Sequence, residues 1–259
     1  MFWELNEIAL LLGLLAGYLL VLELSFRLGR ARAARGDAGA REHIGSLQGS
    51  MLGLLALLLG FTFAMAVSRF DTRKALVLEE ANAIGTTLLR ASLLPEPAQQ
   101  EVPLQLAAYV DARLAFYAAG VDPARLAAAN ASAARLERQL WSLGSAAAQA
   151  DVRSVPVGLF IQSLNEVIDV REKCRVALDN HVPEAVIHLL LVSSCVALAL
   201  VAYGCGLSRR RRFVSNATFA LLLALVLTTI LDIDRPRRGL IQVSQDSLVR
   251  LKASLPPLP

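Results

Sequence analysis

Apolar residues gather in four runs along the chain, and helical periodicity continues through the polar sequence between the second and third runs. The four runs cover Ile8–Phe26, Met51–Val67, Val186–Leu207 and Phe213–Leu231. Each run is close to the roughly 20 residues that a helix needs to cross a bilayer core of about 30 Å. The pattern therefore predicts a multi-span membrane protein with four transmembrane helices.

The second apolar run continues into polar sequence without a proline, so we expect one helix over Gly45–Arg90. At about 1.5 Å per residue this helix is roughly 70 Å long, so it should cross the membrane and project beyond it. Its apolar half carries glycines at four- and seven-residue spacings, which are Gly45, Gly49, Gly53 and Gly60. Such small residues let two helix backbones approach closely in lipid. Their partner is either another helix of the same chain or a second copy of the protein.

The polar half of the same helix carries two stripes of polar residues at helical spacing. One stripe consists of Glu79, Asn82, Thr86 and Arg90, and the other of Arg69, Arg73, Glu80 and Thr87. Residues at these spacings share a face of a helix. Each stripe is either a solvated helix face or part of a charged network just outside the membrane.

Proline and glycine divide the rest of the extramembrane sequence into further helices. Leu94–Pro97 ends the long helix, because proline is tolerated in a first helical turn but not in an interior. Gly120 ends the next helix, and Asp122 caps a third that begins at Pro123. A fourth helix is expected over about 155–180. No strand-like alternation appears, so this part reads as an antiparallel helical bundle.

The sequence thus predicts an all-α integral membrane protein. Four transmembrane helices accompany an extramembrane antiparallel helical bundle, which is continuous with the second and third spans. We divide the chain into the first two spans with a basic linker at 27–44 (1–67), the bundle (68–184), the last two spans with a basic linker at 208–212 (185–232) and a C-terminal tail (233–259).

Arginines in the two short linkers set the expected orientation. They are Arg27, Arg30, Arg32, Arg35 and Arg41 in the first linker and Arg209 to Arg212 in the second. Basic loops favour the cytoplasmic side, so we expect a bacterial inner-membrane protein whose termini and bundle are periplasmic. The opposite ends of the spans carry an equal number of basic residues. The short linkers receive more weight, because long domains translocate largely regardless of charge.

Charged residues also cluster where the last span ends, in the sequence DIDRPRRG at 232–239. This cluster lies on the same side of the membrane as Arg69–Asp71, so we expect the two segments to meet. The resulting candidates for a pore or polar network are Arg69, Asp71, Arg73, Glu79, Glu80, Asn82, Asp232, Asp234, Arg235 and Arg237. Phe61 and Phe63 are the candidates for an apolar constriction, since apolar narrowings gate pores by dewetting.

Several other classes of function find no support in the sequence. The three cysteines form no disulfide framework, and the three histidines lack metal-site spacing. No phosphate-binding loop, nucleophile elbow or H-E-x-x-H motif occurs, and the paired carboxylates Glu166 and Asp169 lack an accompanying histidine. The arginines follow span ends without interleaved aromatic residues. We therefore expect no enzyme, cofactor, metal or nucleic-acid partner.

Three segments carry a family resemblance. They are GFTFAMAVSRFDTRKALVLEEANAIGTTLLRASLLPEP at 60–97, LNEVID at 164–169 and LDIDRPRRGLIQVSQ at 231–245. They resemble a group of mainly bacterial membrane proteins described as bestrophin-like, and the resemblance extends over most of the chain. It implies a four-span, pentameric anion channel with an apolar neck. It also implies that the termini and the helical region are cytosolic, opposite to the orientation that the linker arginines favour.

Two functions follow from these observations. The first is an oligomeric ion channel or pore in the lipid bilayer, conducting an inorganic ion and, by resemblance to bestrophins, an anion. The second is a membrane-anchored sensor or scaffold whose helical bundle binds a partner protein. A homo-oligomer with the Gly45–Arg90 helix at its axis would favour the channel, and a monomer with a stoichiometric foreign partner would favour the scaffold.

Overall fold

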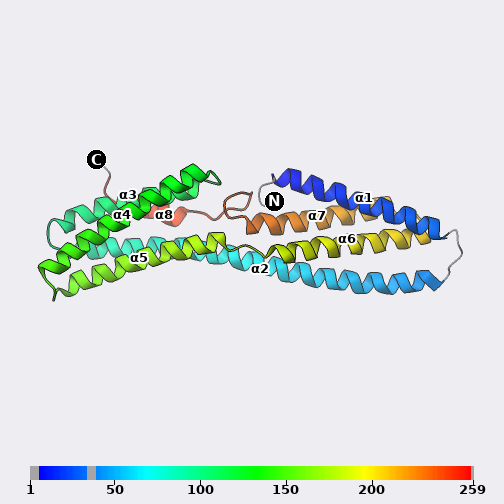
Figure 1. Cartoon of the computed structure of the whole chain (residues 1–259), viewed down its shortest axis with the longest axis horizontal. Coiled ribbons are helices and arrows are strands. Elements are labelled where there is room, and N and C mark those ends of the chain that lie inside the picture. The colour runs from blue at the N-terminus through cyan, green and yellow to red at the C-terminus, as the bar shows by residue number, and fades with distance from the viewer. Residues whose placement is uncertain (1–5, 34–38, 258–259) are drawn as a thin grey trace. The chain divides into compact units, whose positions relative to one another are not determined.

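The computed structural model of the protein describes residues 6–33 and 39–257, so the linker residue Arg35 lies outside the described residues. It contains the helices α1 (Glu7–Ala33), α2 (Gly39–Ala91), α3 (Ala98–Ala118), α4 (Pro123–Ala150), α5 (Val155–Asp179), α6 (Glu184–Leu207), α7 (Phe213–Asp234) and α8 (Asp246–Ser254) (Figure 1). No strand occurs in the described ranges. Four helical segments are long and apolar enough to cross a membrane. The all-α membrane fold expected from the sequence is confirmed.

The chain divides into two compact units. The membrane unit comprises Met1–Ser68 and His181–Arg235, and the bundle unit comprises Arg69–Asn180 and Pro236–Pro259. Helix α2 contributes its first part to the membrane unit and its last part to the bundle unit. The residues after Arg235, expected only as a tail, include α8 and belong to the bundle unit. Nine residues give too few turns for an apolar repeat to identify a helix.

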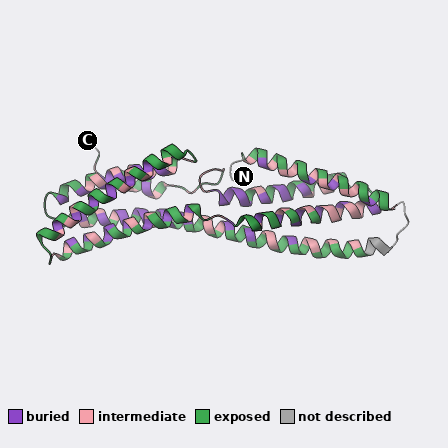
Figure 2. Cartoon of the chain, in the orientation of Figure 1, coloured by how far each residue is buried: buried purple, intermediate pink, exposed green. Residues whose placement is uncertain are grey.

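In the membrane unit, α1 packs against α6 and α7, and α6 packs against α7. Tyr18, Leu22 and Leu198 are among the buried residues of its core. The hydroxyl of Tyr18 lies 2.7 Å from Oγ of Ser194, so this buried phenol has the polar partner that its burial requires. Many residues of these helices are exposed (Figure 2), and large apolar residues such as Leu20 and Leu24 are among them. This arrangement suits helices surrounded by lipid.

The close backbone contact of the membrane unit lies between α1 and α6, at glycines that the sequence analysis did not single out. A Cβ atom built on Gly29 would overlap the carbonyl oxygen of Tyr203, and one built on Gly206 would overlap the carbonyl oxygen of Phe26. Only residues without a Cβ atom allow two backbones to approach this closely. The absent side chains at these two positions therefore set the distance between α1 and α6.

A methyl group at this crossing should destabilise the protein. Gly29→Ala is expected to lower the free energy of unfolding by about 1–3 kcal/mol, the usual cost of overpacking a tight contact. The matched control is Gly13→Ala on the same helix, where a built Cβ atom meets no described atom within 4 Å. Thermal unfolding of both variants in detergent measures the difference. Equal melting temperatures would show that the α1–α6 contact is looser than described.

In the bundle unit, α3 packs against α4 and α8, and α4 packs against α5. Its core includes Leu106, Leu140 and Phe160, all fully buried. Helix α4 begins as expected, since the carboxylate of Asp122 accepts hydrogen bonds from the backbone N–H groups of Ala124 (2.9 Å) and Arg125 (3.2 Å). This cap satisfies two of the donors that a helix N-terminus leaves unpaired.

Candidate functional site

One face of α2 in the membrane unit is uncovered by the described part of the chain. The side chain of Phe63 is 42% exposed, whereas Leu55 and Ala66 on other sides of the helix are buried. Phe61 is 65% exposed, but it lies two residues before Phe63 and therefore on a different side of the helix. Exposed residues recur along the length of this helix (Figure 2). Phe63 follows Gly60 by three residues and therefore lies on the same face as the glycines.

The predicted packing glycines of α2 lie on this exposed face. Gly45, Gly49, Gly53 and Gly60 are all exposed, and a Cβ atom built on each would meet no described atom within 4 Å. The alternative in which they pack against another helix of the same chain is therefore wrong for the described residues. Their contact with a second copy stays a prediction.

The two polar stripes of α2 have different surroundings in the bundle unit. In the first stripe, Asn82 and Thr86 are exposed, and the carboxylate of Glu79 accepts a hydrogen bond of 2.8 Å from the ammonium group of Lys173. In the second stripe, three residues are buried, with exposed fractions of 4% for Arg73 and 0% for Glu80 and Thr87. A solvated face is therefore wrong for these three residues of the second stripe. They point to the same side as Val77 and Ile84, which belong to the core.

Glu80 forms a buried ion pair with Arg113, a residue of α3 that the sequence analysis did not single out. The guanidinium of Arg113 donates to both oxygens of the Glu80 carboxylate, and the hydroxyl of Tyr117 donates to the same group over 3.2 Å. Burial is the largest single influence on the pKa of Arg113 and lowers it, but the charge of Glu80, its hydrogen bond and the nearby tyrosines together raise that pKa above its usual value. Burial and the charge of Glu80 raise the pKa of Tyr117, which therefore stays neutral.

A second buried carboxylate lies nearby in the bundle unit. Glu137 accepts a hydrogen bond of 3.2 Å from the hydroxyl of Tyr109, and its carboxylate lies 2.6 Å from Nε of Arg171. Burial raises the pKa of Glu137, although the charge of Arg171 opposes that shift. These groups connect α3, α4 and α5. The signal that could have identified them is a charged residue on the apolar face of a predicted helix, as with Arg113 on α3 and Glu137 on α4.

Arg69 and Arg73 bind the end of α5 within the bundle unit. The guanidinium of Arg73 donates to the carbonyl oxygens of Ala177 (3.0 Å) and Asn180 (2.9 Å), and that of Arg69 donates to the side chain of Asn180. Cations at a helix C-terminus satisfy its last carbonyl groups and oppose the negative end of its dipole. The structure thus gives both arginines a role in holding α2 to α5. The structure offers no support for Arg73 as a pore-lining residue, because the side chain of Arg73 is buried.

The charged cluster at the end of α7 is divided between the two units. In the membrane unit, Asp232, Asp234 and Arg235 are buried, so these three charges are not solvated. The carboxylate of Asp234 accepts a hydrogen bond of 2.8 Å from the backbone N–H of Val182 and so holds the start of α6 to the end of α7. Arg237 belongs to the bundle unit. The meeting of Asp232, Asp234 and Arg235 with Arg69–Asp71 stays a prediction, since these two groups of residues belong to different units.

In the parts of the chain that the structure describes, no group of histidine, cysteine and acidic residues gathers in a way that could hold a metal ion. The amide of Asn165 donates to Asp169 over 3.2 Å within α5. Cys174, Cys195 and Cys205 are all free thiols. The arrangement therefore consists of an uncovered face on α2 and buried ion pairs that fix the bundle.

These features define a four-span, all-α membrane protein with a helical bundle attached to its second span. The chain belongs to the bestrophin-like family, since the Bestrophin-like domain matches residues 16–248. A comparison with curated proteins gives no match.

Solved structures confirm the fold. Crystal structures of a bacterial bestrophin homologue from Klebsiella pneumoniae share the fold at low sequence identity. One, solved by Zn-SAD phasing, is 16% identical with a TM-score of 0.64, and the match covers 93% of this chain and 99% of that one. A point mutant of the homologue is 15% identical with a TM-score of 0.67, covering 94% and 98%. A second mutant is 16% identical with a TM-score of 0.66, covering 92% and 96%.

Proposed function

We propose that this protein is an oligomeric ion channel in which the exposed face of α2 lines the conducting pathway. The observation that carries the proposal is the uncovered face of α2 in the membrane unit, with its four glycines and the exposed ring of Phe63. In a ring of subunits whose α2 helices surround a central axis, the glycines leave space for a pathway along that axis. The aromatic rings narrow this pathway. Apolar narrowings of this kind gate ion pathways by dewetting.

Membership of the bestrophin-like family supports an anion as the conducted ion and a channel over an enzyme. The resemblance noted in the sequence implies a pentamer, and we propose a homo-oligomer embedded in the bilayer as the working assembly. The neighbouring copies would enclose the pathway that this glycine face lines. A scaffold that binds a foreign protein would not need several copies of the α2 glycine face arranged around an axis.

Planar-bilayer recording of the purified protein tests the proposal. We expect discrete conductance steps whose reversal potential follows the chloride gradient. The mass of the detergent-solubilised particle should correspond to several chains. A monomeric particle that conducts no ion under any ionic condition would contradict the proposed channel, and recovery of a stoichiometric foreign partner with that monomer would favour the scaffold.

We propose an inner-membrane location with the bundle unit in the cytosol, which revises the orientation expected from the linker arginines. The numbers of basic residues on the two sides are equal, and Arg27 and Arg211 of the linkers share the carboxylate of Glu23 at distances of 2.8 and 2.9 Å. The distribution of basic residues therefore favours neither orientation strongly. We base the proposed orientation on the family resemblance. A C-terminal fusion to a reporter that is active only in the periplasm should remain inactive. An active fusion would restore the first orientation.

A further inference from the structure

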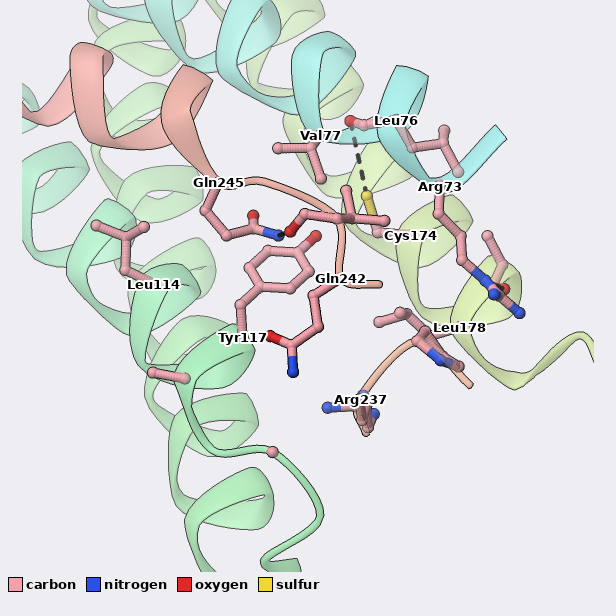
Figure 3. A pocket seen from close by; sticks show the side chains of 15 residues that line it. Arg73, Leu76, Val77, Leu114, Tyr117, Cys174, Leu178, Arg237, Gln242 and Gln245 are labelled. Carbon is pink, nitrogen blue, oxygen red and sulfur yellow. Dashed lines mark hydrogen bonds between the residues drawn. The ribbon is translucent and has the colours of Figure 1, made fainter. Parts of the chain in front are cut away.

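The bundle unit contains a cavity of 470 Å³, bounded by α2, α3, α5 and the segment that precedes α8 (Figure 3). All of its lining residues belong to this one unit. Much of the wall is apolar, with Leu76, Val77, Leu114, Leu178 and Val243 among the lining residues. Its size lies within the range of about 300–1,000 Å³ that is usual for small-molecule sites.

Arg237 lines this cavity with a guanidinium for which the described residues provide no hydrogen-bond acceptor. The group lies 4.4 Å from the centroid of the Phe116 ring, and it makes no hydrogen bond or ion pair with any residue that the structure describes. Burial lowers the pKa of Arg237, although the charge of Asp179 opposes that shift. An arginine carries five N–H donors, and a partly buried one needs an acceptor to offset its lost hydration.

The other polar groups of the cavity do not compete with an anion for Arg237. Its second guanidinium, that of Arg73, is held by carbonyl oxygens at the end of α5, and no acidic residue lines the wall. The side-chain oxygen of Gln245 is buried without a hydrogen-bond partner in the described chain, while its nitrogen donates to Val243 over 3.0 Å. In Figure 3, Gln245 lies above Arg237 in the view, with Gln242 between them.

We propose that this cavity binds a small organic carboxylate with an apolar body. The carboxylate would accept the N–H groups of Arg237 in a charge-assisted pair, the geometry for which a guanidinium is best suited. The apolar body would replace solvent along the wall formed by Leu76, Leu114 and Leu178. This site is separate from the α2 face of the membrane unit, so the inference does not depend on ion conduction.

An inorganic anion fits the cavity less well than an organic one. Chloride or phosphate at Arg237 would leave the apolar wall unfilled, and sites for small molecules owe much of their affinity to such walls. A neutral apolar molecule would fill the wall and leave the guanidinium without an acceptor. Only a ligand with both a carboxylate and an apolar body pairs with the guanidinium of Arg237 and also fills the apolar wall.

Isothermal titration of the purified full-length protein in detergent with phenylacetate tests the proposal. We expect saturable binding of one phenylacetate per chain, and weaker binding of the uncharged analogue phenylacetamide. Arg237→Gln should weaken phenylacetate binding about tenfold or more, because it removes a charge-assisted hydrogen bond. The matched control Arg238→Gln should retain the affinity. Absence of saturable binding, or equal affinity in Arg237→Gln and the native protein, would overturn the proposal.

Cys174 provides a second readout that does not require a variant of Arg237 to fold. Its thiol lines the cavity and is buried. In a protein carrying Cys195→Ser and Cys205→Ser, phenylacetate should slow the reaction of Cys174 with a thiol reagent, and phenylacetamide at the same concentration should slow it less. An unchanged rate at saturating phenylacetate would place the ligand elsewhere and contradict the assignment.

Discussion

Replacing Glu80 with alanine is expected to lower the free energy of unfolding by about 3–5 kcal/mol, the usual cost of removing one partner of a buried ion pair. Glu80 is fully buried, and its carboxylate accepts hydrogen bonds from the guanidinium of Arg113 and the hydroxyl of Tyr117. The variant leaves the Arg113 cation buried without its counter-charge. A loss of this size is a large part of the total stability of a typical domain.

Glu79 is the matched control, because it is the neighbouring residue on α2 and forms an ion pair with Lys173 at the surface. Glu79→Ala should cost about 1 kcal/mol or less, since exposed ion pairs contribute little. Thermal unfolding in detergent, followed by circular dichroism, measures both changes. Equal destabilisation of the two variants would show that the Glu80–Arg113 pair is accessible to water.

Removing the ring of Phe63 should have the largest effect on conduction. The ring is exposed on the glycine face of α2, where the proposed pathway is narrowest. Phe63→Ala should raise the single-channel conductance several-fold, because a wider and less apolar narrowing is more readily filled by water. Leu20→Ala, at an exposed position on α1, is the control and should leave the conductance unchanged. A decrease or no change in Phe63→Ala would exclude this ring as part of the narrowing.

The sequence was sufficient for much of the fold, because lipid and helix geometry impose simple rules. The four spans follow from the lengths of their apolar runs, and the start of α4 follows from a capping residue and an early proline. The long α2 follows from the absence of proline. These features depend on local sequence alone.

Features that depend on which faces meet could not be predicted in the same way. The second polar stripe of α2 has the spacing of a solvated face, yet Arg73 and Glu80 are buried because they pair with groups on α5 and α3. Gly29 and Gly206 are far apart in sequence and belong to no shared motif, so only the packed structure identifies their contact. The regular glycines of α2 drew attention in the sequence, but within one chain they contact nothing that the structure describes.

The most direct test of the proposed pathway is chemical modification of a single cysteine on the exposed face of α2 during recording. The protein would carry Phe63→Cys, with Cys174, Cys195 and Cys205 replaced by serine. A charged, membrane-impermeant thiol reagent should abolish or strongly reduce the conductance of this variant and leave the same cysteine-free protein with Phe63 intact unaffected. A current that persists after complete modification of the cysteine would contradict a pathway lined by this face of α2.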